Sequence, residues 1–117
     1  MGAELPQDID HEVKGLCTVM NRMPGITTRE SCCGHGVESF CISFSVEKRD
    51  DVIPLCYFAD ACHGRCEGWH VLVSTDCLMS HVTYVLEGPV GDKAYRDAEV
   101  IAACICAWLL PAPDGRV

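Results

Sequence analysis

The first part of the chain has the apolar spacing of a helix. Between Asp8 and Arg22 the apolar side chains recur at alternating steps of four and three residues, which places them on one helical face. These apolar positions are Ile9, Val13, Leu16 and Met20, followed by Met23. Pro24-Gly25 comes next and predicts the end of the helix. We therefore expect an amphipathic helix here.

Two strand-like runs follow, Ile26 to Cys33 and Val37 to Glu47. In the second run large apolar residues alternate with smaller or more polar ones, which is typical of a half-buried strand. The apolar members are Phe40, Ile42, Phe44 and Val46. The segment between the runs is Gly34-His35-Gly36, and its glycines suit a turn with positive φ angles. The pattern predicts a β-hairpin.

A second helix and a second pair of strands are predicted in the middle of the chain. Asp50 or Asp51 is placed to cap the helix, which runs to about Cys62. The strand candidates are Trp69 to Thr75 and His81 to Glu87.

The last predicted element is a helix. Gly88-Pro89 is expected to close the sheet, and Asp92 is placed to cap a helix that continues until Pro111. From Val100 to Leu110 this helix is apolar on every side. One face can meet the sheet, so another must meet a second layer, the first helix or another subunit. We therefore expect a homo-oligomer.

The element order is α-ββ-α-ββ-α. Two hairpins separated by a helix cannot form an all-parallel sheet, so we expect the α+β class, with a largely antiparallel sheet and helices packed on it. The length of 117 residues suits a single domain, residues 1–117, with a frayed tail from about residue 111.

Charge and cysteine content narrow the function classes. Seventeen acidic and nine basic side chains give a net charge of −8, which opposes binding to nucleic acid. The first residues lack the basic and apolar regions of a signal peptide, and the longest apolar run is too short to cross a membrane. We expect a cytoplasmic protein whose ten cysteines are mostly free thiols.

The densest set of polar and reactive residues surrounds the first predicted turn. Two glycines beside a histidine let the backbone approach a ligand, and free amide groups there can bind an anionic group. Trp69 is a candidate to stack on a base, although a tryptophan at a strand start more often lies in the core. The candidate ligand-binding residues are Ser31, Cys32, Gly34, His35, Gly36 and Trp69.

The same stretch carries a resemblance to a known family. Ser31-Cys32-Cys33-Gly34-His35-Gly36 resembles the Ser-Cys-Ser-Gly segment of the wybutosine-synthesising methyltransferases, which act on modified guanosine in tRNA. Trp69 to Asp76 is similar to a second segment of that family, with Thr75 in place of a histidine. The resemblance covers about half of this chain. It implies a nucleoside-sized pocket and, as an alternative, an adenosylmethionine-dependent methyltransferase-like activity.

A second resemblance concerns origin. Pro24 to Thr28 followed by Ser31 to Gly36 is similar to strings in small uncharacterised proteins of phages and their bacterial hosts. Phages use small non-enzymatic proteins to sequester nucleotide signals of host immunity, so this resemblance implies a binding role.

Two other readings of the cysteines and histidines stay open. Four residues of the set Cys32, Cys33, His35, Cys62, His63 and Cys66 could hold structural zinc in an interaction protein. Alternatively, Cys32 or Cys33 could act as a nucleophile with His35 as its base, but no orienting carboxylate is obvious beyond Glu30 or Glu87. Because no complete catalytic set can be assembled, we favour non-catalytic binding of a nucleoside- or nucleotide-like small molecule, with the cofactor unknown.

Overall fold

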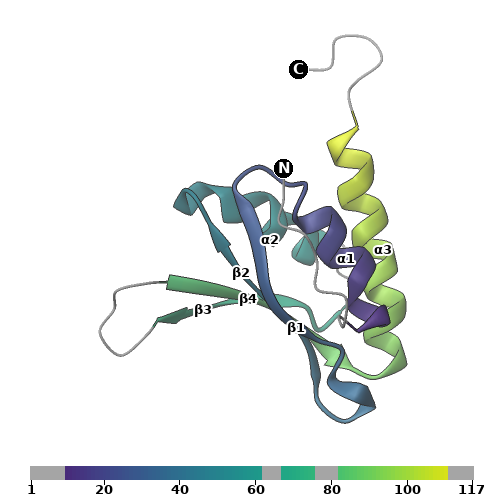
Figure 1. Ribbon diagram of the computed structural model, residues 1–117. Coiled ribbons are helices and arrows are strands. Elements are labelled where there is room, and N and C mark those ends of the chain that lie inside the picture. Colours follow the sequence, from purple (N-terminus) through teal and green to yellow (C-terminus); the bar gives the residue numbers. More distant parts are fainter. Residues whose placement is uncertain (1–9, 62–66, 76–81, 111–117) are drawn as a thin grey trace.

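The fold was analysed in a computed structural model, which describes residues 10–61, 67–75 and 82–110 (Figure 1). Its helices are α1 (His11–Met20), α2 (Ile53–Ala61) and α3 (Asp92–Leu109). Its strands are β1 (Ile26–Cys32), β2 (Ser39–Val46), β3 (His70–Thr75) and β4 (Val82–Val90). Two short 3-10 turns, Gly34–Gly36 and Arg49–Val52, precede β2 and α2.

The four strands form one sheet in the order β1-β2-β4-β3, and every neighbouring pair is antiparallel. The two predicted hairpins, β1–β2 and β3–β4, are joined by pairing of β2 with β4, in which Ile42 lies opposite Leu86. The predicted α+β class with an antiparallel sheet is confirmed.

Alternate residues of the central strand β2 form the middle of the core. Phe40, Ile42 and Phe44 are fully buried, as the alternation in the sequence predicted. From the helices, Leu16 and Ile101 are buried against this side of the sheet. The predicted apolar face of the first helix is confirmed at Val13, Leu16 and Met20, which α1 turns toward the core. Met23 is buried but follows the helix, and Ile9 lies outside the described residues.

The long helix α3 packs against α1, α2 and β4 (Figure 1). At its C-terminal end the Trp108 ring meets Phe58 of α2 edge-on, with 5.7 Å between ring centroids. Two helices therefore cover apolar faces of α3 within the chain, and the expected homo-oligomer stays a prediction. Among the described residues, no helix combines the length and the apolar character needed to cross a membrane.

Two predicted boundaries around α3 are wrong. The strand β4 does not end at Gly88-Pro89 but continues to Val90, which pairs with Ser39 of β2. Glycine is needed at position 88 because the Trp69 ring occupies the space where a side chain would lie. A Cβ atom added to Gly88 would be 2.7 Å from the ring. The cap of α3 is Gly91, with φ 82°, and Asp92 is the first helical residue.

The other predicted elements have the expected order. A 3-10 turn precedes α2, and Asp51 accepts a 3.0 Å hydrogen bond from the Lys48 amide at its start. The expected helix end at Cys62, the expected strand start at His81 and the tail from residue 111 lie outside the described residues.

Candidate functional site

The turn between β1 and β2 has an uncommon backbone. Gly34, His35 and Gly36 have φ angles of 80°, 53° and 78°, so three consecutive residues lie in the left-handed region. Among the described residues, His35 alone adopts positive φ without being glycine. The positive φ angles predicted from the two glycines are therefore present, and the geometry includes the histidine between them.

The amide groups of this turn already have partners. The Gly34 N–H donates to Sγ of Cys32 and the His35 N–H donates to Sγ of Cys33, both at 3.3 Å. The amides of Val37 and Glu38 donate to the Gly34 carbonyl at 2.9 Å. The expected free amides for an external anion are therefore not found at these four positions.

One amide next to the turn does bind a carboxylate, but it is the chain's own Asp10. The Cys33 N–H donates a 3.1 Å hydrogen bond to Oδ2 of Asp10, which lies at the N-cap position of α1. This backbone hydrogen bond is the main reason why the pKa of Asp10 is below its ordinary 3.8. The Asp10 side chain makes no capping bond to α1. Sequence reasoning missed Asp10, since no local pattern relates it to Cys33.

Of the two adjacent cysteines, Cys33 faces inward. Its side chain is 3% exposed, whereas Cys32 is half-buried. The Cys33 Sγ lies 3.7 Å from Nδ1 of His35, a long thiol–imidazole contact that places a nucleophile beside a base. Burial, however, raises the pKa of the Cys33 thiol. The neutral thiol is favoured, so the arrangement gives little support to a cysteine nucleophile.

The structure brings potential metal ligands together at the same turn. The ligand atoms of Asp10, Cys32 and His35 all lie within 4.8 Å of one another. Cys33, which also belongs to the zinc set predicted from the sequence, is not part of this group. The remaining members of that set, Cys62, His63 and Cys66, lie outside the described residues.

Ser31 and Trp69 do not join the group around the turn. The Ser31 side chain hydrogen-bonds to the buried thiol of Cys17 on α1. Trp69 is 7% exposed, and its ring centroid lies 5.1 Å from that of Phe40 in an edge-on contact. Trp69 is therefore a core residue in this structure, and its ring is not available to stack on a base.

Tyr95 of α3 connects the turn to a groove between α1 and α3. Its hydroxyl hydrogen-bonds to the Cys33 thiol, and this bond is the main reason why the pKa of Tyr95 is above its ordinary 10.0. The same side chain lines a pocket of about 460 Å³. Sequence reasoning placed Tyr95 on the last helix only as part of its periodic face, and nothing in its spacing indicated this second role.

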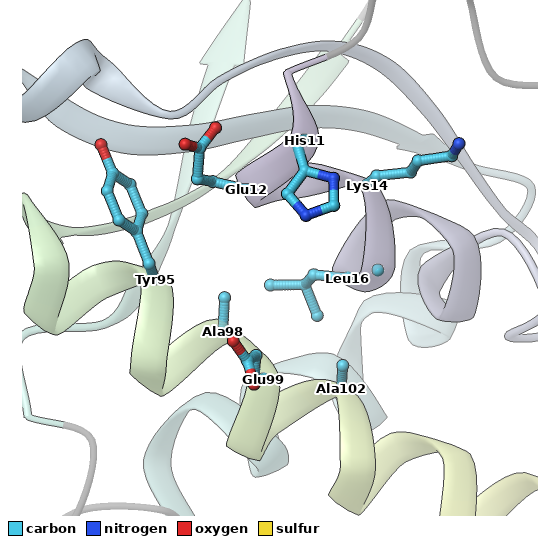
Figure 2. A pocket seen from close by; sticks show the side chains of 9 residues that line it. His11, Glu12, Lys14, Leu16, Tyr95, Ala98, Glu99 and Ala102 are labelled. Carbon is cyan, nitrogen blue, oxygen red and sulfur yellow. The ribbon is translucent and has the colours of Figure 1, made fainter.

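We call this pocket the α1–α3 groove. Its lining residues are His11, Glu12, Lys14, Gly15, Leu16, Tyr95, Ala98, Glu99 and Ala102. Figure 2 shows the Tyr95 ring and the Glu12 carboxylate close together at one end, with Leu16 directed into the space between the helices. Buried Leu16 and Ala98 form an apolar floor, whereas the charged lining residues are exposed. An apolar floor with a few polar groups at its edge is typical of a small-molecule site.

Gly15 of α1 lines this groove and faces open space. A Cβ atom added at Gly15 would find nothing within 4 Å. Glycine inside a helix costs about 0.5–1 kcal/mol relative to alanine, and packing among the described residues does not require it here.

Comparison with protein-family models, with curated proteins and with solved structures finds no match. The functional assignment therefore depends on the geometry of this chain.

Proposed function

We propose that the protein binds a small ring-containing molecule of nucleoside size in the α1–α3 groove, without chemical turnover. The observation that carries the proposal is the groove itself, a pocket of about 460 Å³ with an apolar floor and polar groups at one end. Its volume falls within the range of about 300–1,000 Å³ that is common for small-molecule sites.

The polar groups favour a ligand with N–H donors. The Glu12 carboxylate can accept hydrogen bonds from the amino or imino edge of a nucleobase, and the Tyr95 hydroxyl lies beside it (Figure 2). The floor offers Leu16 and the small side chains of Ala98 and Ala102 to a flat ring. This proposal retains the nucleoside-like ligand expected from the sequence and moves its site from the turn to the neighbouring groove.

Charge favours a nucleoside over a nucleotide. The groove is lined by two carboxylates, Glu12 and Glu99, and by one lysine, Lys14. The whole chain carries a net charge of −8. The groove carboxylates and the negative net charge of the chain both repel a phosphate group. We therefore expect a nucleotide to bind more weakly than the corresponding nucleoside.

The test is calorimetric titration of the full chain with nucleosides and with their 5′-monophosphates, using wild type and two leucine variants. Gly15→Leu fills the groove while replacing a poor helix former with a good one, so we expect binding to disappear at an unchanged or raised melting temperature. The control is Thr18→Leu, which adds the same side chain to an exposed position of α1 outside the groove. Equal affinity of Gly15→Leu and wild type, or no nucleoside binding by wild type, contradicts the proposal.

A further inference from the structure

We propose that Asp10, Cys32 and His35 form a zinc site at the β1–β2 turn, with a fourth coordination position open to solvent. The site contains no lining residue of the α1–α3 groove, so it stands or falls independently of the proposed small-molecule binding. It also differs from the zinc set considered from the sequence, because it includes Asp10.

The three ligand atoms are near the separations that zinc requires. They all lie within 4.8 Å of one another, and Nε2 of His35 is 4.0 Å from Oδ2 of Asp10. Tetrahedral zinc with bonds of about 2.0–2.3 Å holds its ligand atoms roughly 3.3–3.8 Å apart. Small side-chain rotations therefore suffice to close the site around an ion.

Each ligand is held in place by a second group, as is common around metal ions. The Cys33 N–H donates to Asp10 Oδ2 at 3.1 Å, and the Gly34 N–H donates to Cys32 Sγ at 3.3 Å. Nδ1 of His35 lies 3.7 Å from the Cys33 sulfur, to which it can donate its proton. In that tautomer the lone pair of Nε2 is free on the side of Asp10.

The backbone of the turn places the imidazole over the carboxylate. His35 has φ 53° between two glycines, in the left-handed region that glycine adopts most readily and that asparagine, aspartate and histidine adopt more often than other residues. A non-glycine residue in this region is more frequent where a side chain has a function.

The ligand types select the metal. Thiolate and imidazole together favour Zn²⁺ over Mg²⁺ or Ca²⁺, which prefer sites made of oxygen atoms. The His35 side chain is 71% exposed and that of Asp10 is 28% exposed, so water can reach the open position. Three protein ligands with an open fourth position are the arrangement of zinc sites that bind water or a further ligand.

The experiment is zinc titration of the full chain by calorimetry after treatment with a chelator. We expect a single Zn²⁺ per chain, and we expect Co²⁺ at the same site to show a thiolate-to-cobalt charge-transfer band. Cys32→Ser should remove that band and weaken zinc affinity by roughly ten-fold or more. His35→Gly should weaken affinity similarly without loss of stability, because glycine accepts the φ of 53° at this position.

Matched controls separate this site from other thiols and histidines. Cys56→Ser alters an exposed cysteine elsewhere, and His70→Ala alters an exposed histidine that pairs with Glu87. Both should bind zinc like wild type. The proposal is overturned if wild type binds no zinc, if binding survives Cys32→Ser and His35→Gly, or if Cys66→Ser alone abolishes it, since that result assigns the ion to a different ligand set.

Discussion

The indole N–H of Trp69 donates a 3.0 Å hydrogen bond to Oδ2 of Asp97, and this buried bond joins the start of β3 to α3. Lys93 approaches the same oxygen at 2.6 Å from one helical turn away. The Asp97 side chain is 8% exposed, so its charge is stabilised by these donors rather than by bulk water. The pair explains why Trp69 belongs to the core.

Removing the acceptor should destabilise the protein. In Asp97→Ala the Trp69 N–H loses its partner in a buried position, which should lower the free energy of unfolding by about 1–3 kcal/mol. Asp97→Asn keeps an oxygen for the indole and should cost less. Urea unfolding of both variants measures the difference in their free energies of unfolding. Equal losses of stability in the two variants would show that the hydrogen bond to the indole contributes little to stability.

A substitution beneath the Trp69 ring should also destabilise the protein. A Cβ atom at Gly88 would lie 2.7 Å from the ring, so Gly88→Ala should lower stability by about 1–3 kcal/mol. Gly15→Ala is the matched control, because a Cβ atom there meets nothing within 4 Å. For this control, helix propensity predicts that the free energy of unfolding rises by about 0.5–1 kcal/mol. Melting curves that rank Gly88→Ala at or above Gly15→Ala would contradict this account.

The end of α1 is tied to β1 by a buried asparagine. Asn21 is 6% exposed, accepts a 2.8 Å hydrogen bond from the Thr28 N–H and donates one of 2.9 Å to the Thr28 hydroxyl. Asn21→Ala removes both bonds and should lower the free energy of unfolding by about 1–3 kcal/mol. Thr18→Ala, which removes an exposed bond to the Lys14 carbonyl, should stay within about 0.5 kcal/mol of wild type. Denaturant titration compares the two variants.

Alkaline pH should reveal the buried thiol of Cys17. Burial raises the pKa of Cys17 from its ordinary 9.0 to about 11. The unfolded chain therefore loses this proton first, so the stability from the neutral thiol is present below pH 9 and is lost as pH rises toward 11. Urea unfolding of wild type and Cys17→Ala across this range should give a steeper decline for wild type. Parallel declines would show that Cys17 titrates alike in both states.

The sequence by itself determined the helices, the strands and the fold class. The steps of four and three that bury Val13, Leu16 and Met20, and the alternation that buries Phe40 and Ile42, arise from the repeat of each backbone structure. Such repeats are visible within a few residues of one another, so they can be found without knowledge of the tertiary structure. The turn with positive φ angles could be predicted for the same reason, because the glycines that favour such angles lie within the turn itself.

Only the tertiary structure decided where the candidate sites lie. Three features join residues that are far apart in the chain. They are the hydrogen bond from the Cys33 amide to Asp10, the bond between Tyr95 and the Cys33 thiol, and the groove between α1 and α3. The end of β4 was likewise set by a long-range partner, because Val90 pairs with Ser39 of β2. Contacts of this kind depend on how helices and strands pack against one another, and no local period of the sequence encodes that packing.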